Sequence, residues 1–488
     1  MTRSLSDAVA FARGPALKNR FVLAPMANCQ SHPDGSLGDD EYRWLVSRAE
    51  GGFALVLTTA SWVQRSGKGI EGQLGVASDD HVAGLERLAH GVHAAGAACA
   101  VQLVHGGRRS EARFPGEPLL APWDDVETGA RAMTTAEVEQ LVEDFVLAAL
   151  RAERAGIDGV ELHGAHGYQL AAFLDRENNR RTDRYGGSPE NRARVFFEIV
   201  DGIRARAGAN FQVGVRLSPE RWGIDLAEMR ELARRLMTSG RIDYLDMSLW
   251  DCFKEPSDPK YAGKPLIDHF TDLERGATRL GVAGKIMDAA TAQRCVDHGA
   301  DFVLLGRGAI LQQDFPKRAL ADAGFRSVER PVTREYLRSQ VIGPAFVEYL
   351  TTWKGFVADW PPGERRRAAA SARASLRCGR ASPPASGRAE RLDPGDLRAQ
   401  FVLGACGVVV QLQPRPEAVV EPEIARQSQA GVDRDRTLAR DDLADAHLRN
   451  ADVLGQPIGR NAHRDQEFLA QNLAGRRVGN FAHSLASQ

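Results

Sequence analysis

Short apolar runs alternate with longer amphipathic segments through the first two thirds of the chain. Several amphipathic segments begin at a helix-capping residue, such as Asp79, Thr134 and Ser188. The runs that read as buried strands are 21–27, 54–61, 98–105, 159–165, 211–218, 244–250, 281–287 and 302–307, and the helical segments between them include 79–95, 134–155, 189–207, 225–239 and 288–298. Alternation of strand and helix indicates parallel pairing through right-handed crossovers. Eight such units predict an α/β fold, a closed (β/α)8 TIM barrel, over an open doubly wound sheet.

The same pattern divides the chain into a barrel domain, 1–360, and a tail, 361–488. Residues 1–20 are expected to form a short lid or floor, and 308–360, which is rich in aromatic residues, is expected to pack on the barrel. The tail contains no Lys, Trp, Tyr or Met and is dominated by Arg, Ala, Asp, Gly and Gln. Such a composition offers few large side chains for a core. We expect a low-complexity tail that is disordered, or non-native sequence from a shifted reading frame.

Composition narrows the class of protein. Lys plus Arg (63) nearly balance Asp plus Glu (64), so no overall field favours nucleic acid or an anionic membrane as a partner. The six cysteines, at 29, 99, 252, 295, 378 and 406, form neither a CxxC pair nor a zinc spacing, which is typical of a reducing compartment. The first 20 residues lack the apolar core of a signal peptide, and no run reaches the ~20 apolar residues of a membrane span. We expect a cytoplasmic protein.

The stretch 159–168, GVELHGAHGY, concentrates candidate chemistry at one strand end. Its apolar alternation predicts a strand, and its glycines permit a sharp turn that brings His163, His166 and Tyr168 together. A β/α barrel keeps its active site at this end of its strands. The spacing His163-x-x-His166 is also half of a metal site, but strands one, two and eight supply no further ligands. A metal-dependent barrel hydrolase is therefore the less favoured alternative, and no metal is expected.

Two polar side chains, Gln102 and Arg216, interrupt otherwise apolar strands. Leaving such a group unpaired inside a barrel costs several kcal/mol, so each needs either a buried carboxylate or a ligand as partner. Gly284 and Gly306-Arg307 follow strands seven and eight, where barrels often bind phosphate through backbone N–H groups. Arg307 adds a guanidinium that can bind phosphate in bidentate fashion. A phosphate, an amide and a cation around one rim indicate a flat, phosphorylated cofactor, and FMN fits.

Together these motifs resemble the old yellow enzyme family of FMN-dependent NADH:flavin oxidoreductases. The resemblance covers about residues 4–325 and rests on NRFVLAPMA at 19–27, QLVHGGR at 102–108, HGAHGYQLAAFL at 163–174, NRRTDRYGGSPENRAR at 179–194, VRLS at 215–218 and LLGRG at 304–308. By that resemblance the residues that hold FMN are Pro25, Met26, Ala27, Ala60, Gln102, Arg216, Gly284, Gly306 and Arg307. The substrate would lie against His163, His166, Tyr168 and Cys29, with the two imidazoles on its carbonyl oxygen and Tyr168 as proton donor.

The resemblance implies a ping-pong ene-reductase that takes hydride from NADPH or NADH and reduces the activated C=C bond of an enone in the same site. The chain departs from many members at Ala27, where they carry Thr or Cys, and at Cys29, where an aromatic residue is frequent. Two alternatives stay open: a flavoprotein that reduces other acceptors, such as quinones or nitro compounds, and a flavin-binding protein without turnover. A homo-oligomer is compatible with the sequence, and the tail as a partner-binding module is a further hypothesis.

Overall fold

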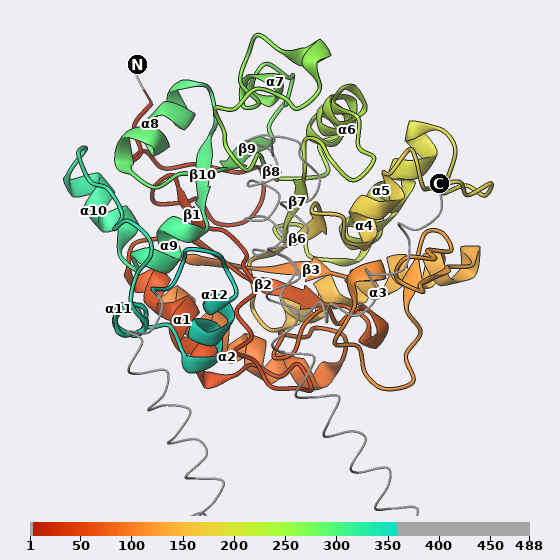
Figure 1. The fold of residues 1–488 in the computed structure, drawn as a ribbon, viewed down its shortest axis with the longest axis horizontal. Coiled ribbons are helices and arrows are strands. Elements are labelled where there is room, and N and C mark those ends of the chain that lie inside the picture. The colour runs from red at the N-terminus through yellow and green to blue at the C-terminus, as the bar shows by residue number, and fades with distance from the viewer. Residues whose placement is uncertain (1–2, 359–488) are drawn as a thin grey trace, which may run out of the picture. The chain divides into compact units, whose positions relative to one another are not determined.

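In the computed structural model, residues 3–358 are described, and they form a closed parallel β-barrel surrounded by helices (Figure 1). The barrel strands are β1 Phe21–Leu23, β2 Leu55–Trp62, β3 Ala98–Val104, β6 Gly159–Gly164, β7 Gln212–Leu217, β8 Tyr244–Ser248, β9 Arg279–Ala283 and β10 Phe302–Leu305. They pair in the order β1-β10-β9-β8-β7-β6-β3-β2. The predicted TIM barrel is therefore confirmed. The expected tail, 361–488, lies outside the described residues.

The predicted strands are all present, with shifted ends. The largest shift concerns the run 281–287, which forms a strand only over Arg279–Ala283. At Gly284 the backbone instead packs closely against the loop after β8. A Cβ at this position would lie only 2.8 Å from the backbone nitrogen of Cys252. β1 ends at Leu23, two residues before Pro25, whose ring nitrogen cannot donate to a neighbouring strand. The chain therefore leaves the barrel wall earlier than its apolar pattern suggests.

The helices follow the strands in the expected alternation. They are α1 Asp39–Glu50, α2 Val82–Ala94, α3 Thr135–Arg154, α4 Gln169–Phe173, α5 Pro189–Arg206, α6 Leu226–Thr238, α7 Asp268–Thr271, α8 Ala289–Asp297, α9 Arg307–Leu311, α10 Phe315–Ala321, α11 Arg334–Ser339 and α12 Pro344–Thr351. Thr134 and Ser188 cap α3 and α5 as predicted. Asp79 is not a cap, because Ser78 occupies that position before a short 3-10 turn. No helix within residues 3–358 combines the length and the apolar character needed to cross a membrane.

The N-terminal segment closes the barrel at the end opposite the candidate chemistry. Val9 and Leu17 form a small bridge with each other, and they pack with Phe11 against Tyr244 and Phe302, the first residues of β8 and β10. Parallel strands begin at the bottom of such a barrel, so this segment is a floor and not a lid. The apolar floor thus closes the end of the barrel where the strands begin, and the polar candidate residues lie at the opposite end, where the strands finish.

The segment that follows the last barrel strand packs on the barrel, as predicted, and a buried arginine, Arg48, hydrogen-bonds to it. Arg48 on α1 has no exposed surface. Its guanidinium donates to the carbonyl of Ala309 in α9 at 3.1 Å and to that of Gln340 after α11 at 2.8 Å, and it lies 4.7 Å from the centre of the Trp44 ring. Burial without a carboxylate partner lowers the pKa of Arg48 to about 9. One side chain therefore joins α1, α9 and the α11–α12 connection.

Replacing Arg48 by leucine is expected to destabilise the protein by about 3 kcal/mol, because the two carbonyl groups would stay buried without donors. Denaturant unfolding measures this change. Arg43→Leu, on the exposed side of the same helix, is the matched control and should change stability by less than about 0.5 kcal/mol. Equal losses in the two variants would show that helix α1, and not the buried contacts, governs the effect.

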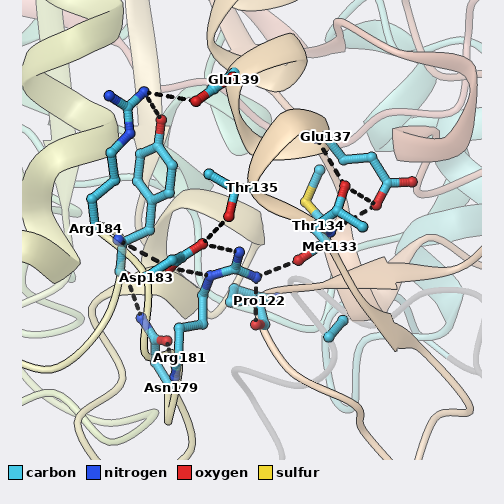
Figure 2. Close-up of polar contacts among 12 residues, drawn as sticks. Pro122, Met133, Thr134, Thr135, Glu137, Glu139, Asn179, Arg181, Asp183 and Arg184 are labelled. Carbon is cyan, nitrogen blue, oxygen red and sulfur yellow. Dashed lines mark hydrogen bonds and ion pairs between the residues drawn. The ribbon is translucent and has the colours of Figure 1, made fainter.

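The polar motif at 179–194 joins two connections of the barrel outside the cavity. Figure 2 shows Arg181 reaching the carbonyl oxygens of Pro122 and Met133 while it pairs with Asp183, which accepts from Thr135 at the start of α3. None of these side chains lines the candidate site. The motif fixes the 106–133 excursion, which includes the small strands β4 Leu120–Ala121 and β5 Arg131–Ala132, against the connection between α4 and α5.

Candidate active site

A cavity opens where the barrel strands end. Its empty space, including the open mouth, is about 1340 Å³. The predicted site residues that line it are Pro25, Met26, Ala27, Ala60, Gln102, His163, His166, Tyr168, Arg216, Gly284, Gly306 and Arg307. The ends of parallel strands meet at one rim, so residues distant in sequence converge there.

Cys29 is the predicted site residue that does not line this cavity. It lies near Tyr349, a lining residue, and its backbone has a φ of 58°, in the left-handed region. Burial, with the charges of Glu41 and Glu71, raises the pKa of the Cys29 thiol to about 12, so the thiol stays protonated. A direct contact between Cys29 and a substrate remains a prediction.

His163 presents an N–H group toward its neighbours on one wall of the cavity. Its Nδ1 accepts a hydrogen bond from the Ala165 backbone N–H at 3.3 Å, so the ring proton resides on Nε2. The ring centre lies 5.0 Å from that of His166 and 4.9 Å from that of Tyr168. Burial, and then the positive charges of Arg216 and Arg109, hold the pKa of His163 well below its usual range. The imidazole is therefore a neutral donor at neutral pH.

We assign the opposite tautomer to His166. Its Nε2 lies 2.8 Å from the Ser248 hydroxyl, which accepts from Arg216 at 3.4 Å and has its own proton left to donate. A bond from this hydroxyl to Nε2 places the proton of His166 on Nδ1. Burial and the nearby Arg216 keep the pKa of this ring far below its usual range as well. His166 adopts a φ of 61°, a left-handed conformation that non-glycine residues seldom take and that clusters at functional sites.

Gln102 and Arg216 each have a buried carboxyl partner, the first of the two possibilities that the sequence left open. Gln102 Nε2 donates to Glu161 at 2.7 Å, and Arg216 Nε lies 2.9 Å from Asp246. Both side chains also line the cavity. A carboxyl partner does not exhaust an amide or a guanidinium, which carry several donors each. They remain suited to the polar edge of a flat ring.

The rim after β10 is open where a phosphate would need it. A Cβ added to Gly306 would meet only the Met26 sulfur, at 3.5 Å, so the backbone faces free space beside Arg307. Gly284 differs, because backbone atoms of the loop after β8 already crowd its Cβ direction. The donor set of amide, guanidinium and open glycine backbone fits FMN. Among residues 3–358, no group of three or more His, Cys, Asp or Glu side chains is arranged to hold a metal ion.

The cavity residues that the sequence analysis did not assign to the site include Arg109, Trp250, Tyr349 and Trp353. Trp250 follows β8 with a φ of 65°, and its ring centre lies 6.0 Å from that of His166. Tyr349 and Trp353 come from the segment that folds back after the barrel. Arg109 stacks on Tyr168, with its guanidinium 4.5 Å from the ring centre. The helical spacing of the two aromatic residues in 344–353 was their one visible signal, and it is shared by ordinary core residues.

His105, next to this site, gives the protein a defined pH dependence of stability. The ring is fully buried, accepts from the Gly107 N–H at 3.0 Å and bonds to Ser66, and burial lowers its pKa to about 3. The unfolded chain binds this proton near pH 6.5, so stability present above pH 6.5 is lost as the pH falls toward 3. His105→Gln should reduce the slope of unfolding free energy against pH by about 1.2 kcal/mol per unit between pH 5 and 6. Denaturant titrations at each pH measure it, and parallel slopes would contradict it.

The fold and the site define a class: a TIM-barrel oxidoreductase built around FMN. A sequence profile of the NADH:flavin oxidoreductase / NADH oxidase family matches residues 13–323, and the chain belongs to this family, which includes the old yellow enzymes. An NADPH dehydrogenase of Halalkalibacterium halodurans is 35% identical over 324 residues, 64% of this chain and 93% of the relative. A probable NADH-dependent flavin oxidoreductase of Bacillus subtilis is 32% identical over 64% of this chain and 87% of its own. The solved old yellow enzyme homologue of Zymomonas mobilis superposes with a TM-score of 0.60 at 27% identity, covering 71% and 99% of the two chains.

The enzyme is thus an NAD(P)H:flavin oxidoreductase, with FMN as cofactor and NAD(P)H as electron donor. This membership supersedes the hydrolase alternative. A barrel of this family needs no separate nucleotide-binding domain, which agrees with the missing GxGxxG motif after a strand.

Proposed function

We propose that this enzyme reduces the activated C=C bond of α,β-unsaturated carbonyl compounds. The observation that carries the proposal is the group of His163, His166 and Tyr168 on the cavity wall, where the His163 ring centre lies 5.0 Å from that of His166 and 4.9 Å from that of Tyr168. Two neutral N–H donors beside a phenol match the two needs of such a reaction. The carbonyl oxygen gains negative charge that needs donors, and the α-carbon needs a proton.

In this proposal, Gln102 and Arg216 would hold the pyrimidine edge of FMN, and Gly306 and Arg307 would hold its phosphate. Pro25, Met26, Ala27 and Ala60, which also line the cavity, would contact its ring. When bound, FMN supplies hydride transfer between NAD(P)H and the acceptor.

The protein side of the reaction follows from the tautomers. His163 donates from Nε2 and His166 from Nδ1 to the substrate oxygen, which draws electron density from the C=C bond. Both donors are preorganised by their own hydrogen bonds to the Ala165 backbone and to Ser248, so they need no rearrangement as charge develops. Tyr168 delivers the proton to the α-carbon as general acid. Arg109, stacked on the phenol, restrains its ring.

The test is an anaerobic titration of the flavin spectrum of the purified enzyme. NADPH should bleach the visible absorption, and cyclohexenone should restore it. Bleaching followed by reoxidation with quinones or nitro compounds but not with enones would overturn the proposed acceptor class. Bleaching that no acceptor reverses would favour the flavin-binding alternative.

Trp250 should limit the size of the acceptor, because it closes the cavity beside His166. Trp250→Gly removes that wall, and glycine accepts a φ of 65° without steric cost. We expect kcat/KM for cyclohexenone to fall by roughly tenfold relative to that for a bulky aryl-substituted enone, the range that one pocket contact contributes. Steady-state kinetics with the two substrates measure the ratio. Trp123→Gly, a tryptophan outside the cavity lining, should leave it unchanged, and an unchanged ratio in Trp250→Gly would contradict the prediction.

A further inference from the structure

Two carboxyl groups lie inside the barrel where neither cofactor nor substrate can touch them. Glu161 on β6 and Asp246 on β8 have no exposed surface and do not line the cavity. Glu161 accepts from Gln102 Nε2 at 2.7 Å. Asp246 Oδ2 lies 2.9 Å from Arg216 Nε. Each of the two polar side chains that reach the flavin cavity therefore has its own carboxyl group behind it.

The surrounding strands exclude solvent from the two carboxyl groups. Tyr244 occupies the space over Gly214, where a Cβ would lie 2.1 Å from the tyrosine ring, and its hydroxyl lies beside Glu161. Burial raises the pKa of both carboxyl groups, Arg216 opposes the shift at both, and the charge of Asp246 adds to the shift at Glu161. With one guanidinium for two buried carboxyl groups, the negative charge stays on Asp246, which lies 2.9 Å from Arg216 Nε, and Glu161 holds its proton.

We propose that Asp246 and Glu161 are positioning residues for the flavin, Asp246 by offsetting the charge of Arg216 and Glu161 by fixing the orientation of the Gln102 amide. The inference rests on the proposed place of the pyrimidine edge beside Gln102 and Arg216. Two-electron reduction adds negative charge at that edge. A free guanidinium there would favour reduction strongly, and a neighbouring carboxylate weakens this effect in a low-dielectric interior.

In this proposal, Glu161 fixes the orientation of the Gln102 amide and does not change the charge beside the flavin. Because its carboxyl oxygen takes one N–H of Gln102, the amide oxygen and the second N–H are left for the cavity in a fixed order. Without this partner the amide is free to turn, and half of its orientations would set donor against donor at the flavin edge. The consequence is a loss of cofactor affinity without a change of charge.

The first experiment measures the flavin reduction potential by equilibrium titration against a reference dye, without enone. Asp246→Asn should shift the equilibrium toward reduced flavin at least tenfold, which is about 30 mV upward for a two-electron couple. Arg216→Gln should shift it in the opposite direction. The matched control is Asp243→Asn, at the residue before β8, where a buried carboxylate pairs with Arg204 and Arg13 away from the cavity lining. In this control, the equilibrium constant for flavin reduction should stay within threefold of the wild-type value.

An Asp246→Asn potential equal to that of the wild type would overturn the inference. If this variant does not fold, the double variant Arg216→Gln/Asp246→Asn provides the test, since its potential should lie above that of Arg216→Gln alone, and an equal value would overturn the offset. A potential that Arg216→Gln leaves unmoved would overturn the inference together with the flavin placement. Shifts of the expected signs in an enzyme that does not turn over enones would support the inference while the proposed function fails.

The second experiment separates orientation from charge at Glu161. Glu161→Gln keeps an acceptor for Gln102, so the dissociation constant of FMN should stay within about threefold of the wild-type value. Glu161→Leu removes the acceptor, and the dissociation constant should rise by at least tenfold, the cost of about one hydrogen bond. Fluorescence of released FMN measures both. Equal affinities in the two variants would overturn the role of Glu161.

Discussion

Replacing Tyr168 by phenylalanine is expected to slow reoxidation of the reduced enzyme by an enone by roughly 10²- to 10⁴-fold, the range for loss of a general acid. Reduction by NADPH should keep its rate, because that half-reaction needs no proton at a substrate carbon. The phenylalanine ring preserves the contact with His163, whose centre lies 4.9 Å away, and the stacking of Arg109. Stopped-flow absorbance, which records the two half-reactions separately, measures the effect.

A second phenol in the same cavity provides the control. Tyr349 lines the cavity from α12, and Tyr349→Phe should leave the enone step within a factor of about three. A loss in Tyr349→Phe with normal reoxidation in Tyr168→Phe would assign the proton to Tyr349. Normal reoxidation in both variants would show that water supplies the proton, against the proposed mechanism.

The barrel was predictable because its signals are local. Each strand is a short apolar run, and each connection carries a helical period, so counting the units gives the fold. The ends of the strands were less predictable. The apolar run 281–287 continues past Ala283, yet the backbone at Gly284 turns to pack against the loop after β8. Such a contact depends on two segments more than 30 residues apart.

The predicted cavity residues lie in or just after the barrel strands, whereas several missed residues reach the cavity from a turn or from the segment after the barrel. Trp250 reaches the cavity through a left-handed turn, and Tyr349 and Trp353 reach it because their segment folds back over the barrel. Neither feature follows from hydrophobic periodicity. Because burying Gln102 and Arg216 is costly, the sequence correctly predicted that each has a partner. The sequence of one strand does not show which residue of the neighbouring strand lies opposite. Glu161, which pairs in register with Gln102, read only as the polar position of an alternating strand.

Removing either imidazole donor, as in His163→Leu or His166→Leu, is expected to reduce kcat/KM for an enone by roughly 10²- to 10³-fold, the usual loss for one preorganised oxyanion donor. The tautomers sharpen this expectation. His163 donates from Nε2, because its Nδ1 accepts from the Ala165 N–H, and His166 is assigned to donate from Nδ1, with its Nε2 accepting from Ser248. The amide nitrogen of glutamine reaches the place of Nε2, and that of asparagine the place of Nδ1.

Substitution by amides should therefore rescue the two positions in opposite ways. His163→Gln and His166→Asn should retain more activity than His163→Asn and His166→Gln, and steady-state kinetics on the four variants measure the crossover. Since burial lowers the pKa of both rings well below 6.5, wild-type enone reduction should also show no acid limb from these residues between pH 6 and 8. An acid limb near pH 6.5 that disappears in His163→Gln would identify a charged imidazolium as the donor. Equal rescue by both amides at each position would mean that the site selects any N–H group and not a fixed tautomer.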